Sequence, residues 1–527
     1  MKWWSVPSAL LVLAGTLVGP VAGATGDPGR PVVRTENGAV RGSSDGRTAV
    51  FKGIPYADPP VGELRWRDPR PVRPWHGVRD AGRPGPVCAQ DPGEVPDGSV
   101  HEDCLYLNVT RPENRSGGPA PVIVWLHGGG FYMGAGSNYD PARMVERGGV
   151  VVVTFNYRLG VFGFFGHPGL AGSGQFGLAD QQAALRWVRR NVAAFGGDPG
   201  RVTVAGQSAG AISACAHLTS RPAAGLVDRV VSQSGSCDLS WAAGAEYRAE
   251  PADAIFEPLA GVEERGRRAA GELGCAGTAP AVVLDCLRGL PVEVVRKVHK
   301  RFIQPAHGNG LLPDDPVAAL ASGRFHRVPV LTGQTRDEAT LATSIYDRLQ
   351  PMGEQTYREV MAEAFGARLP EVEAEYPRSA YGSAALAWSA VVTDRKWTCT
   401  QLTTSRRLAR HVPVYHYEFA DPQAPLLTEP PMPMGAYHSS DLWSLFVLGG
   451  RPHRLTPEQQ VLADRMVDYW TSFAATGDPN GPGRPHWPRF DVRASTPHVQ
   501  DLAPGEHGIG PVDLATRHHC RFWAGMP

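Results

Sequence analysis

The sequence predicts an α/β fold, in which a mostly parallel central sheet is covered by helices on both faces. The first observation is a series of short, continuously apolar runs, which are typical of strands buried on both sides. The second is that helical patterns separate these runs, and alternation of strand and helix specifies a parallel sheet. The third is the segment 201–218, RVTVAGQSAGAISACAHL, which combines a strand, a tight glycine-flanked turn and a helix. We expect the rest of the chain to be arranged around Ser208 in this turn.

The N-terminal segment 1–24 has the features of a signal peptide. It contains one cationic residue, Lys2, then an apolar run over 9–18, and Ala-Gly-Ala at 22–24 fits the small-residue rule for cleavage. The apolar run is too short to span a bilayer. We therefore expect a secreted (extracellular) protein whose mature chain begins near Thr25. No later run reaches the roughly 18 apolar residues of a membrane-spanning helix, so no integral membrane segment is expected after cleavage.

The composition of residues 25–527 favours a single large domain with excursions. There is no internal repeat or low-complexity segment, and proline and glycine are spread along the whole chain instead of marking a linker. The 52 Lys and Arg residues balance the 52 Asp and Glu residues, and no basic stripe is visible. Nucleic acid and anionic membrane surfaces are therefore not expected as partners.

The eight cysteines indicate disulfides rather than a metal site. An even count in an exported chain favours disulfides, and no CxxC or cysteine–histidine cluster has the spacing of a zinc site. The adjacent His518 and His519 point in different directions, so we expect them at the surface and not as ligands. Neither a metal nor another cofactor is expected.

Candidate strands and helices follow one another along the chain. The first two strands are expected to form a small antiparallel sheet, and the later ones belong to the central sheet. A helix over 178–195 should end at Gly196 and Gly197, because glycine is the usual residue just after a helix. The expected strands are 32–41, 48–56, 105–110, 122–126, 149–157, 202–204, 228–232, 328–331 and 412–419.

Ser208 is the candidate nucleophile because it lies in a Gly-x-Ser-x-Gly pattern between a strand and a helix. A Cβ at Gly206 or Gly210 would collide with the neighbouring strand and helix, so these glycines are typical of a nucleophile elbow. With 62 glycines in 527 residues, the pattern alone is weak evidence. Ser44 also matches it, but that copy lies in a polar hairpin turn with no helix after it. We therefore reject Ser44 and retain Ser208.

A serine nucleophile needs a histidine base and a carboxylate that orients the base. In α/β-hydrolases these partners follow the serine in the order acid, then histidine. Two downstream loops, LTGQTRDEAT and MGAYHSSDL, come after core strands and should meet at the edge of the sheet near Ser208. They nominate Glu338, with Asp337 as its competitor, and His438.

A glycine run after the strand at 122–126 is the candidate oxyanion hole. His127 is followed by three glycines and Phe131, and consecutive glycines let backbone N–H groups approach a ligand closely. The N–H of Ala209, the residue after the candidate nucleophile, would add a further donor. A flexible turn is the alternative, but a bare turn rarely has a core strand before it and an aromatic residue after it.

Taken together, these residues resemble the type B carboxylesterase family, the carboxylesterase and cholinesterase branch of the α/β-hydrolases. The resemblance covers nearly the whole mature chain in order, and several of the matching stretches are too long for chance. They are VVRTENGAVRG, FKGIPYADPPVGELRW, EDCLYLNV, HGGGF, NYRLGVFGF, FGLADQQAALRWVRRNVAAFGGDP, GQSAG, VSQSG, TGDPN and HHCRFW.

The resemblance implies an α/β-hydrolase fold and the catalytic triad Ser208, Glu338 and His438, and it favours Glu338 over Asp337. It places the oxyanion donors on Gly129, Gly130 and Ala209. It also implies two buried ion pairs, Arg65 with Glu102 and Arg158 with Asp180. The implied disulfides are Cys88–Cys104, Cys275–Cys286 and Cys399–Cys520, with Cys215 and Cys237 left either as a fourth bridge or as two free thiols.

The sequence also departs from the best-known members of this family. Gln207 stands where they have a glutamate beside the nucleophile, near the site for the alcohol part of the substrate, and Ala339 replaces a glycine after the acid. The loop 88–104 has no aromatic residue, whereas cholinesterases use a tryptophan there to bind choline. A cholinesterase is therefore not expected. Trp241 is in register with a tryptophan of the cholinesterase pocket wall and is a candidate for the acyl side of the site.

Two classes of function follow from the resemblance. The first is a secreted serine esterase acting on a small-molecule or lipid-like ester, with a lipase or an esterase for aromatic or polyester-like substrates as variants of it. The second is a non-catalytic recognition protein on the same fold. Members of that second class typically lack a triad residue, and all three positions are filled here, so the enzyme is favoured.

Overall fold

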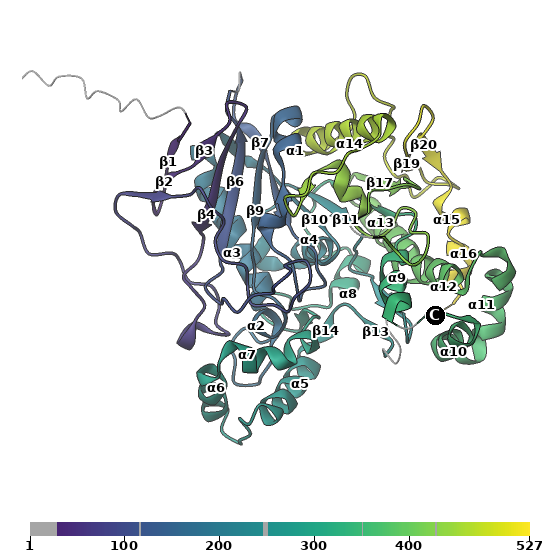
Figure 1. Ribbon diagram of the computed structural model, residues 1–527, viewed down its shortest axis with the longest axis horizontal. Helices are drawn as coiled ribbons and strands as arrows, with labels where there is room; N and C mark the ends of the chain where they lie inside the picture. Colours follow the sequence, from purple (N-terminus) through teal and green to yellow (C-terminus); the bar gives the residue numbers. More distant parts are fainter. Residues whose placement is uncertain (1–28, 115–116, 246–250, 350, 427–428, 527) are drawn as a thin grey trace, which may run out of the picture.

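The computed structural model describes residues 29–114, 117–245, 251–349, 351–426 and 429–526, so the expected signal peptide lies outside the described residues. In the described part of the chain the central sheet has eleven strands (Figure 1). Their order across the sheet is β20 (Ile509–Val512), β19 (Val499–Leu502), β17 (Val414–Phe419), β16 (Val330–Thr335), β11 (Arg229–Gln233), β10 (Gly197–Gln207), β7 (Ala120–Leu126), β9 (Val151–Phe155), β6 (Tyr106–Pro112), β4 (Thr48–Pro55) and β3 (Ser43–Ser44).

Within this order, the strands from β19 through to β9 are all parallel to one another. Antiparallel strands are confined to the two edges of the sheet. The predicted fold class is therefore confirmed. One expected pairing is wrong: β4 joins the central sheet next to β6 and does not form a small sheet with the first strand. The small sheet consists of β1 (Val32–Thr35), β2 (Gly38–Arg41) and β5 (Val78–Asp80).

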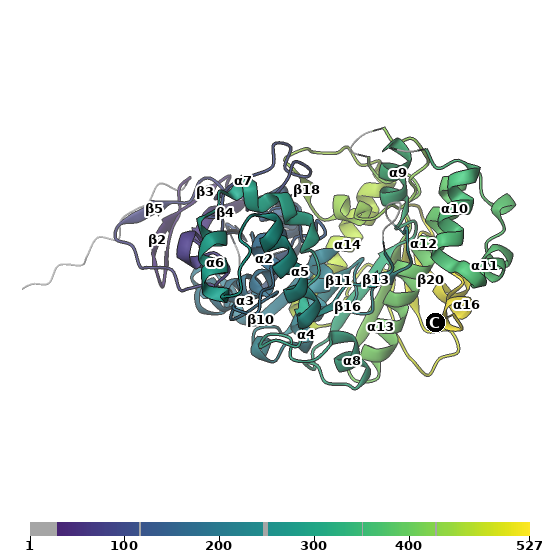
Figure 2. The ribbon, with the colours of Figure 1, turned by 90° about the horizontal axis from the view of Figure 1, so that it is seen from below.

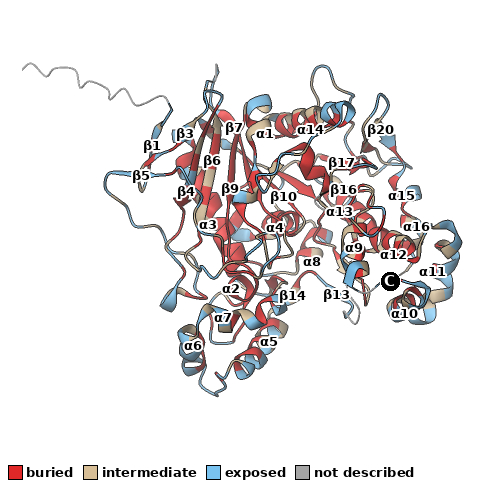
Figure 3. Ribbon diagram, viewed as in Figure 1, coloured by how far each residue is buried: buried red, intermediate tan, exposed pale blue. Residues whose placement is uncertain are grey.

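Helices cover both faces of the sheet because successive side chains of its buried strands point to opposite sides. On β7, Val122 and Val124 belong to the core shared with α3 (Phe176–Asn191) and α4 (Ala209–Thr219). Ile123 and Trp125 belong to the core on the other face, shared with α1 (Ala142–Gly148) and α14 (Pro457–Thr476). Figure 3 shows that the strands between these layers are buried.

Two groups of helices project beyond the sheet, one at the bottom and one at the right of Figure 1, and Figure 2 shows both from below. The first contains α5 (Leu259–Glu272), α6 (Pro280–Gly289) and α7 (Val292–Val295), followed by the 3₁₀ helix η5 (Arg296–Arg301). The second contains α9 (Thr340–Leu349), α10 (Glu354–Phe365), α11 (Leu369–Glu375) and α12 (Ala384–Val392), followed by the π-helix η8 (Thr393–Thr398). Among the residues that the structure describes, no helix has the length and apolar content needed to cross a bilayer.

Shorter elements connect these layers. Further helices are α2 (Gly160–Phe164), α8 (Pro316–Ala321), α13 (Cys399–Ala409), α15 (Leu514–Arg517), α16 (Cys520–Ala524) and the 3₁₀ helix η9 (Ser440–Ser444). Short two-residue strands are β8 (Tyr139–Asp140), β12 (Ser240–Trp241), β13 (Asp253–Ala254), β14 (Glu257–Pro258), β15 (Ala306–His307) and β18 (Val447–Leu448).

Four disulfides link cysteines of the described chain. The structure contains the three pairs that the resemblance implies, Cys88–Cys104, Cys275–Cys286 and Cys399–Cys520. Cys215 and Cys237 form a fourth bridge, which is one of the two alternatives that the sequence left open. This bridge joins α4 to the segment that follows β11, next to the candidate nucleophile.

Two buried ion pairs hold the segments around the sheet. Arg65 and Glu102 form a bidentate pair, and Arg65 also donates to the carbonyl of Leu290, close to the end of α6. Arg158 and Asp180 form a second bidentate pair, with both distances 2.7 Å and side-chain exposures of only 3% and 0%. Both predicted pairs are therefore confirmed. The pair of Arg158 and Asp180 joins the first turns of α3 to the segment after β9.

We predict that Arg158→Ala and Asp180→Ala each lower the free energy of unfolding by about 3–5 kcal/mol, because each leaves an unpaired charge in the interior. The control is Arg267→Ala, which breaks the exposed pair with Glu264 and should cost about 1 kcal/mol or less. Thermal melting of the three variants measures the difference. Equal melting temperatures for the interior and the surface variants would contradict the prediction.

Candidate active site

The turn between β10 and α4 presents Ser208 at the carboxyl end of the sheet. Ser208 has a φ of 57° and a ψ of −124°, an unfavourable conformation for a residue with a Cβ. Its N–H donates to the carbonyl of Gln233 at 2.9 Å, which fixes the turn to the neighbouring strand β11. The side chain of Ser208 borders a large cavity. The local geometry is that of a nucleophile elbow.

Two glycines allow this turn because the helix lies very close to the sheet. A Cβ on Gly206 would be 2.4 Å from the carbonyl carbon of Gly210 in α4. A Cβ on Gly210 would be 2.0 Å from the carbonyl oxygen of Leu126 in β7. Both contacts are with backbone atoms, which cannot move aside as a flexible side chain can. The Gly-x-Ser-x-Gly pattern is thus a packing requirement between α4 and the two strands.

Glu338 and His438 are in direct contact, although 100 residues separate them. The Oε2 atom of Glu338 lies 2.5 Å from Nδ1 of His438, and its Oε1 atom accepts a hydrogen bond from the N–H of Thr335 at 2.8 Å. Glu338 is only 1% exposed. The carboxylate therefore holds the imidazole in one orientation and fixes its tautomer, with the proton on Nδ1.

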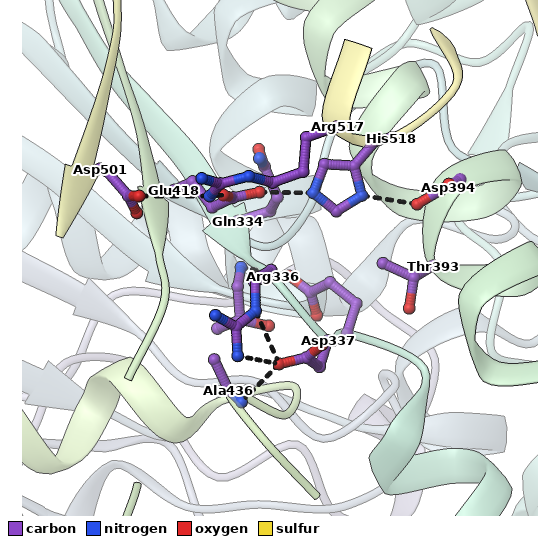
Figure 4. A network of polar contacts seen from close by, with 12 residues as sticks. Gln334, Arg336, Asp337, Thr393, Asp394, Glu418, Ala436, Asp501, Arg517 and His518 are labelled. Carbon is purple, nitrogen blue, oxygen red and sulfur yellow. Dashed lines mark hydrogen bonds and ion pairs between the residues drawn. The ribbon is translucent and has the colours of Figure 1, made fainter. Parts of the chain in front are cut away.

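Asp337, the competing acid, has a different set of contacts. Its carboxylate pairs with Arg336 at 3.0 Å and accepts the N–H of Ala436 at 2.8 Å (Figure 4). A backbone bridge also joins Asp337 to Tyr437. Asp337 therefore fastens the loop before His438, while Glu338 contacts the imidazole itself.

The side chain of Gln207 contacts the opposite edge of the imidazole. Its amide nitrogen lies 3.1 Å from Nε2 of His438. With the ring proton on Nδ1, Nε2 has a lone pair and accepts this hydrogen bond. Because Gln207 directly precedes Ser208, the basic nitrogen of His438 faces the turn that carries the serine.

The glycine loop after β7 lies beside the same turn. A Cβ on Gly128 would be 2.8 Å from Oε1 of Gln207 and 3.2 Å from Cβ of Ser208. Gly129 and Gly130 have φ values of 98° and 59°, which favour glycine. Ala209 is the first residue of α4, so its N–H has no acceptor within the helix.

His127 lies at the start of the glycine loop. It is fully buried, and this burial lowers its pKa to about 4, so the ring is neutral at pH 7. The ring stacks on Tyr157 at 4.3 Å between centroids, and the Tyr157 hydroxyl donates to the carbonyl of His127 at 2.8 Å. The loop is therefore held by aromatic packing and by its own backbone.

A cavity of about 650 Å³ opens beside Ser208. Phe131 and Ile212 form part of its wall, together with Trp241 of β12. Trp397 also lines it and packs on the ring of His438, with centroids 4.6 Å apart. The cavity thus extends from the serine to residues of both projecting groups of helices.

Sequence reasoning missed Trp397 and its neighbour Lys396. Both lie on the π-helix η8, which no motif marks and whose position depends on distant contacts. One contact lies beside the candidate acid, since the hydroxyl of Thr393 accepts the N–H of Ala339 at 3.0 Å. A π-helix is rare and frequent at functional sites, but its sequence resembles that of any helix.

The expected surface position of His518 is wrong. His518 is 4% exposed and lies between Asp394 and Glu418, with both nitrogens 2.5 Å from carboxylate oxygens (Figure 4). Burial opposes the charge on the ring, but the two carboxylates outweigh it and raise the pKa of His518 to about 10. The C-terminal segment is thereby fastened to η8. His519 is half-buried and pairs with Glu375.

Asp441 is a second buried carboxyl group near the candidate triad. Its Oδ2 atom accepts hydrogen bonds from Gln233 at 2.8 Å and from the Tyr417 hydroxyl at 3.0 Å. Burial, reinforced by the charge of Glu338, raises the pKa of Asp441 to about 6. Since its ordinary pKa is 3.8, ionisation of Asp441 destabilises the fold as the pH rises from about 4 to about 6.

We predict that Asp441→Asn raises the melting temperature at pH 7.5, because the amide keeps the acceptor oxygen but carries no charge. The expected gain is about 2 kcal/mol at pH 7.5 and close to zero at pH 4, where the carboxyl group is already protonated. The control is Asp97→Asn at an exposed position, with no pH-dependent gain expected. Melting curves at the two pH values test this. A variant that is less stable than wild type at pH 7.5 would refute it.

Comparison with known proteins shows the family to which the chain belongs. The chain is 34% identical to para-nitrobenzyl esterase of Bacillus subtilis (strain 168), over 87% of this chain and 92% of that protein. It is 32% identical to cocaine esterase of Homo sapiens, over 91% of this chain and 89% of that protein. It is also 32% identical to carboxylesterase 5A of Felis catus, over 92% of this chain and 91% of that protein. The model of the Carboxylesterase family matches residues 29–523, and the chain therefore belongs to this family of carboxylic ester hydrolases.

Proposed function

We propose that the protein is a secreted serine esterase that hydrolyses carboxylic esters through an acyl-enzyme intermediate on Ser208. The observation that carries this proposal is the contact between Glu338 and His438 beside a serine held at positive φ. Family membership supports the reaction class. The proposed triad is Ser208, Glu338 and His438.

In the first half of the reaction, Oγ of Ser208 attacks the ester carbonyl while Nε2 of His438 takes its proton. Glu338 keeps the imidazole oriented and stabilises the imidazolium that forms. The histidine then gives the proton to the departing alcohol. In the second half, water attacks the acyl-enzyme with His438 again as the base, and the carboxylic acid is released.

The N–H groups of Gly129, Gly130 and Ala209 are the proposed oxyanion hole. They belong to two segments, the glycine loop and the start of α4, that meet beside Ser208. Backbone donors held in this way stabilise the charge that develops on the carbonyl oxygen without reorganisation. The dipole of α4 adds a partial positive charge at the same point.

Gln207 and Trp241 are the proposed substrate-binding residues. Gln207 contacts His438 at the position where a carboxylate would add a negative charge beside the alcohol group. Trp241 lines the cavity next to the serine, and we assign it to the acyl side. A large indole there would limit the length of the acyl chain.

Export to the extracellular space is part of the same proposal. The segment 1–24 has the composition of a signal peptide. The four disulfides support an oxidising compartment, because disulfides persist outside the cytosol and are rare within it.

We predict that Ser208→Ala lowers kcat/KM for p-nitrophenyl esters by about 10⁴-fold or more, because it removes the nucleophile and leaves only binding and the oxyanion donors. The matched control is Ser44→Ala, which changes the other Gly-x-Ser-x-Gly serine and should have wild-type activity. Circular dichroism checks that both variants are folded. Covalent labelling of a serine other than Ser208 by a fluorophosphonate would reject the assignment.

We predict that Trp241→Ala increases kcat/KM for long acyl chains relative to acetyl, because it enlarges the wall beside the serine. One extra methylene in such a pocket is worth roughly 1–3 kcal/mol, so the ratio should change by about tenfold or more. Rates across p-nitrophenyl esters from acetate to decanoate measure it, with Trp75→Ala in the N-terminal part of the chain as the control. An unchanged chain-length profile in a folded Trp241→Ala variant would remove this residue from the pocket.

A further inference from the structure

The loop that the Cys88–Cys104 disulfide closes contains a fully buried glutamine, Gln90. The backbone of Gln90 pairs with that of Ser99 across the loop, with the two N–H groups donating to the opposite carbonyls at 3.0 and 2.9 Å. The side chain is 0% exposed, and a buried amide is costly unless its donors and its acceptor find partners. The partners of this amide lie in the segment that follows the glycine loop.

The amide of Gln90 pairs with the backbone of Gly134 in both directions. Its Nε2 atom donates to the carbonyl of Gly134 at 2.9 Å, and its Oε1 atom accepts the N–H of Gly134 at 2.9 Å. Nε2 also donates to the carbonyl of Cys88 at 3.0 Å. Gly134 is itself buried, so this side chain acts for Gly134 as the backbone of a neighbouring strand would.

Gly134 lies directly against the start of the glycine loop. A Cβ on Gly134 would be 2.6 Å from Nδ1 of His127 and 2.8 Å from the carbonyl oxygen of Gly128. A Cβ on Gly129 would be 2.2 Å from the carbonyl oxygen of Met133, whose N–H donates to the carbonyl of Gly129 at 3.0 Å. The chain therefore forms a closed turn here, in which the position of Gly134 restricts that of Gly129.

Arg296 of the 3₁₀ helix η5 holds the same disulfide loop from outside. Its Nη1 atom donates to the carbonyls of Gln90 and Ser99 at 3.0 and 3.1 Å. It also pairs with Asp91 at 3.2 Å. The backbone of Gln90 is thus fixed by its own loop and by the first group of projecting helices, which leaves its amide little freedom to move.

We propose that Gln90 is a positioning residue for the oxyanion hole. Its amide fixes Gly134 and, through the closed turn, the N–H groups of Gly129 and Gly130. This inference rests on the proposed function, since it takes these N–H groups as the oxyanion donors. The negative charge on the substrate oxygen develops only towards the tetrahedral intermediate, so a displaced donor lowers kcat and leaves KM nearly unchanged.

The test is Gln90→Met, which removes the amide and keeps an unbranched side chain of similar length. We expect kcat for p-nitrophenyl acetate to fall by about 30-fold, since a displacement of about 1 Å can cost on the order of 100-fold, while KM changes by less than about threefold. A trifluoromethyl ketone adds to a serine nucleophile and places an oxyanion in the hole. Its inhibition should therefore weaken by a factor similar to the loss in kcat.

The matched control is Gln459→Met on α14, which belongs to the helix layer on the other face of the sheet. Gln459 is also buried, and its amide accepts the N–H of Thr456 and donates to the carbonyl of Gln423, both at 2.9 Å. This variant should lose a comparable amount of thermal stability and keep the kcat and the ketone affinity of wild type. Equal losses of kcat in the two folded variants would show a purely structural role for Gln90 and overturn the proposal.

A second variant decides the question if Gln90→Met does not fold. Arg296 is half-buried, and Arg296→Met removes the support of the disulfide loop but leaves the amide of Gln90 in place. We expect a smaller loss of kcat, about threefold to tenfold, with a parallel loss of ketone affinity. Lys297→Met changes the exposed neighbour in η5 and should have no effect. Unchanged kcat and ketone affinity in Arg296→Met would then overturn the proposal.

The outcomes for the two proposals are distinguishable. If wild type hydrolyses no ester and a fluorophosphonate does not label Ser208, the proposed function itself fails. If wild type is active and folded Gln90→Met has the same kcat and ketone affinity, only the positioning role of Gln90 is refuted.

Discussion

The close contact between α4 and the sheet is the constraint on which the site depends. Gly210 lies so near to the carbonyl of Leu126 that any side chain would collide with the backbone of β7. This contact holds Ser208 at positive φ, a strain of about 1–3 kcal/mol that the surrounding packing must compensate. It also brings the first N–H of α4 beside the glycine loop, so one packing contact positions both the serine and the proposed oxyanion donors.

The parallel sheet brings the other members of the site to the same place. Strands β16 and β17 are adjacent and parallel, so the loops that follow them meet at one edge. Asp337 fastens these loops together, and Glu338 can then contact His438 with little freedom to move. The buried cluster around His518 fixes η8 from the outside, and η8 in turn presents Trp397 to His438.

The charge of a buried histidine in this structure depends on the groups that surround it. Burial leaves His127 neutral, and its ring stacks on Tyr157 beside the glycine loop. His518 has two carboxylates and remains charged. Arg265 and Arg301, which line the cavity, are paired with Glu257 and Glu272. Burial thus leaves one histidine neutral, while two neighbouring carboxylates keep the other charged.

The sequence by itself determined the fold class and nominated Ser208, because both depend on local patterns of apolar residues and glycines. It also nominated Glu338 and His438, since chain order and strand ends restrict where they can lie. The resemblance favoured Glu338 over Asp337, and the contact with the imidazole agrees with it. Only the tertiary structure decided that Cys215 pairs with Cys237 and that His518 is buried. It alone brought the amide of Gln90 to the backbone of Gly134. These features depend on contacts between segments far apart in the chain, and no local pattern of residues encodes such contacts.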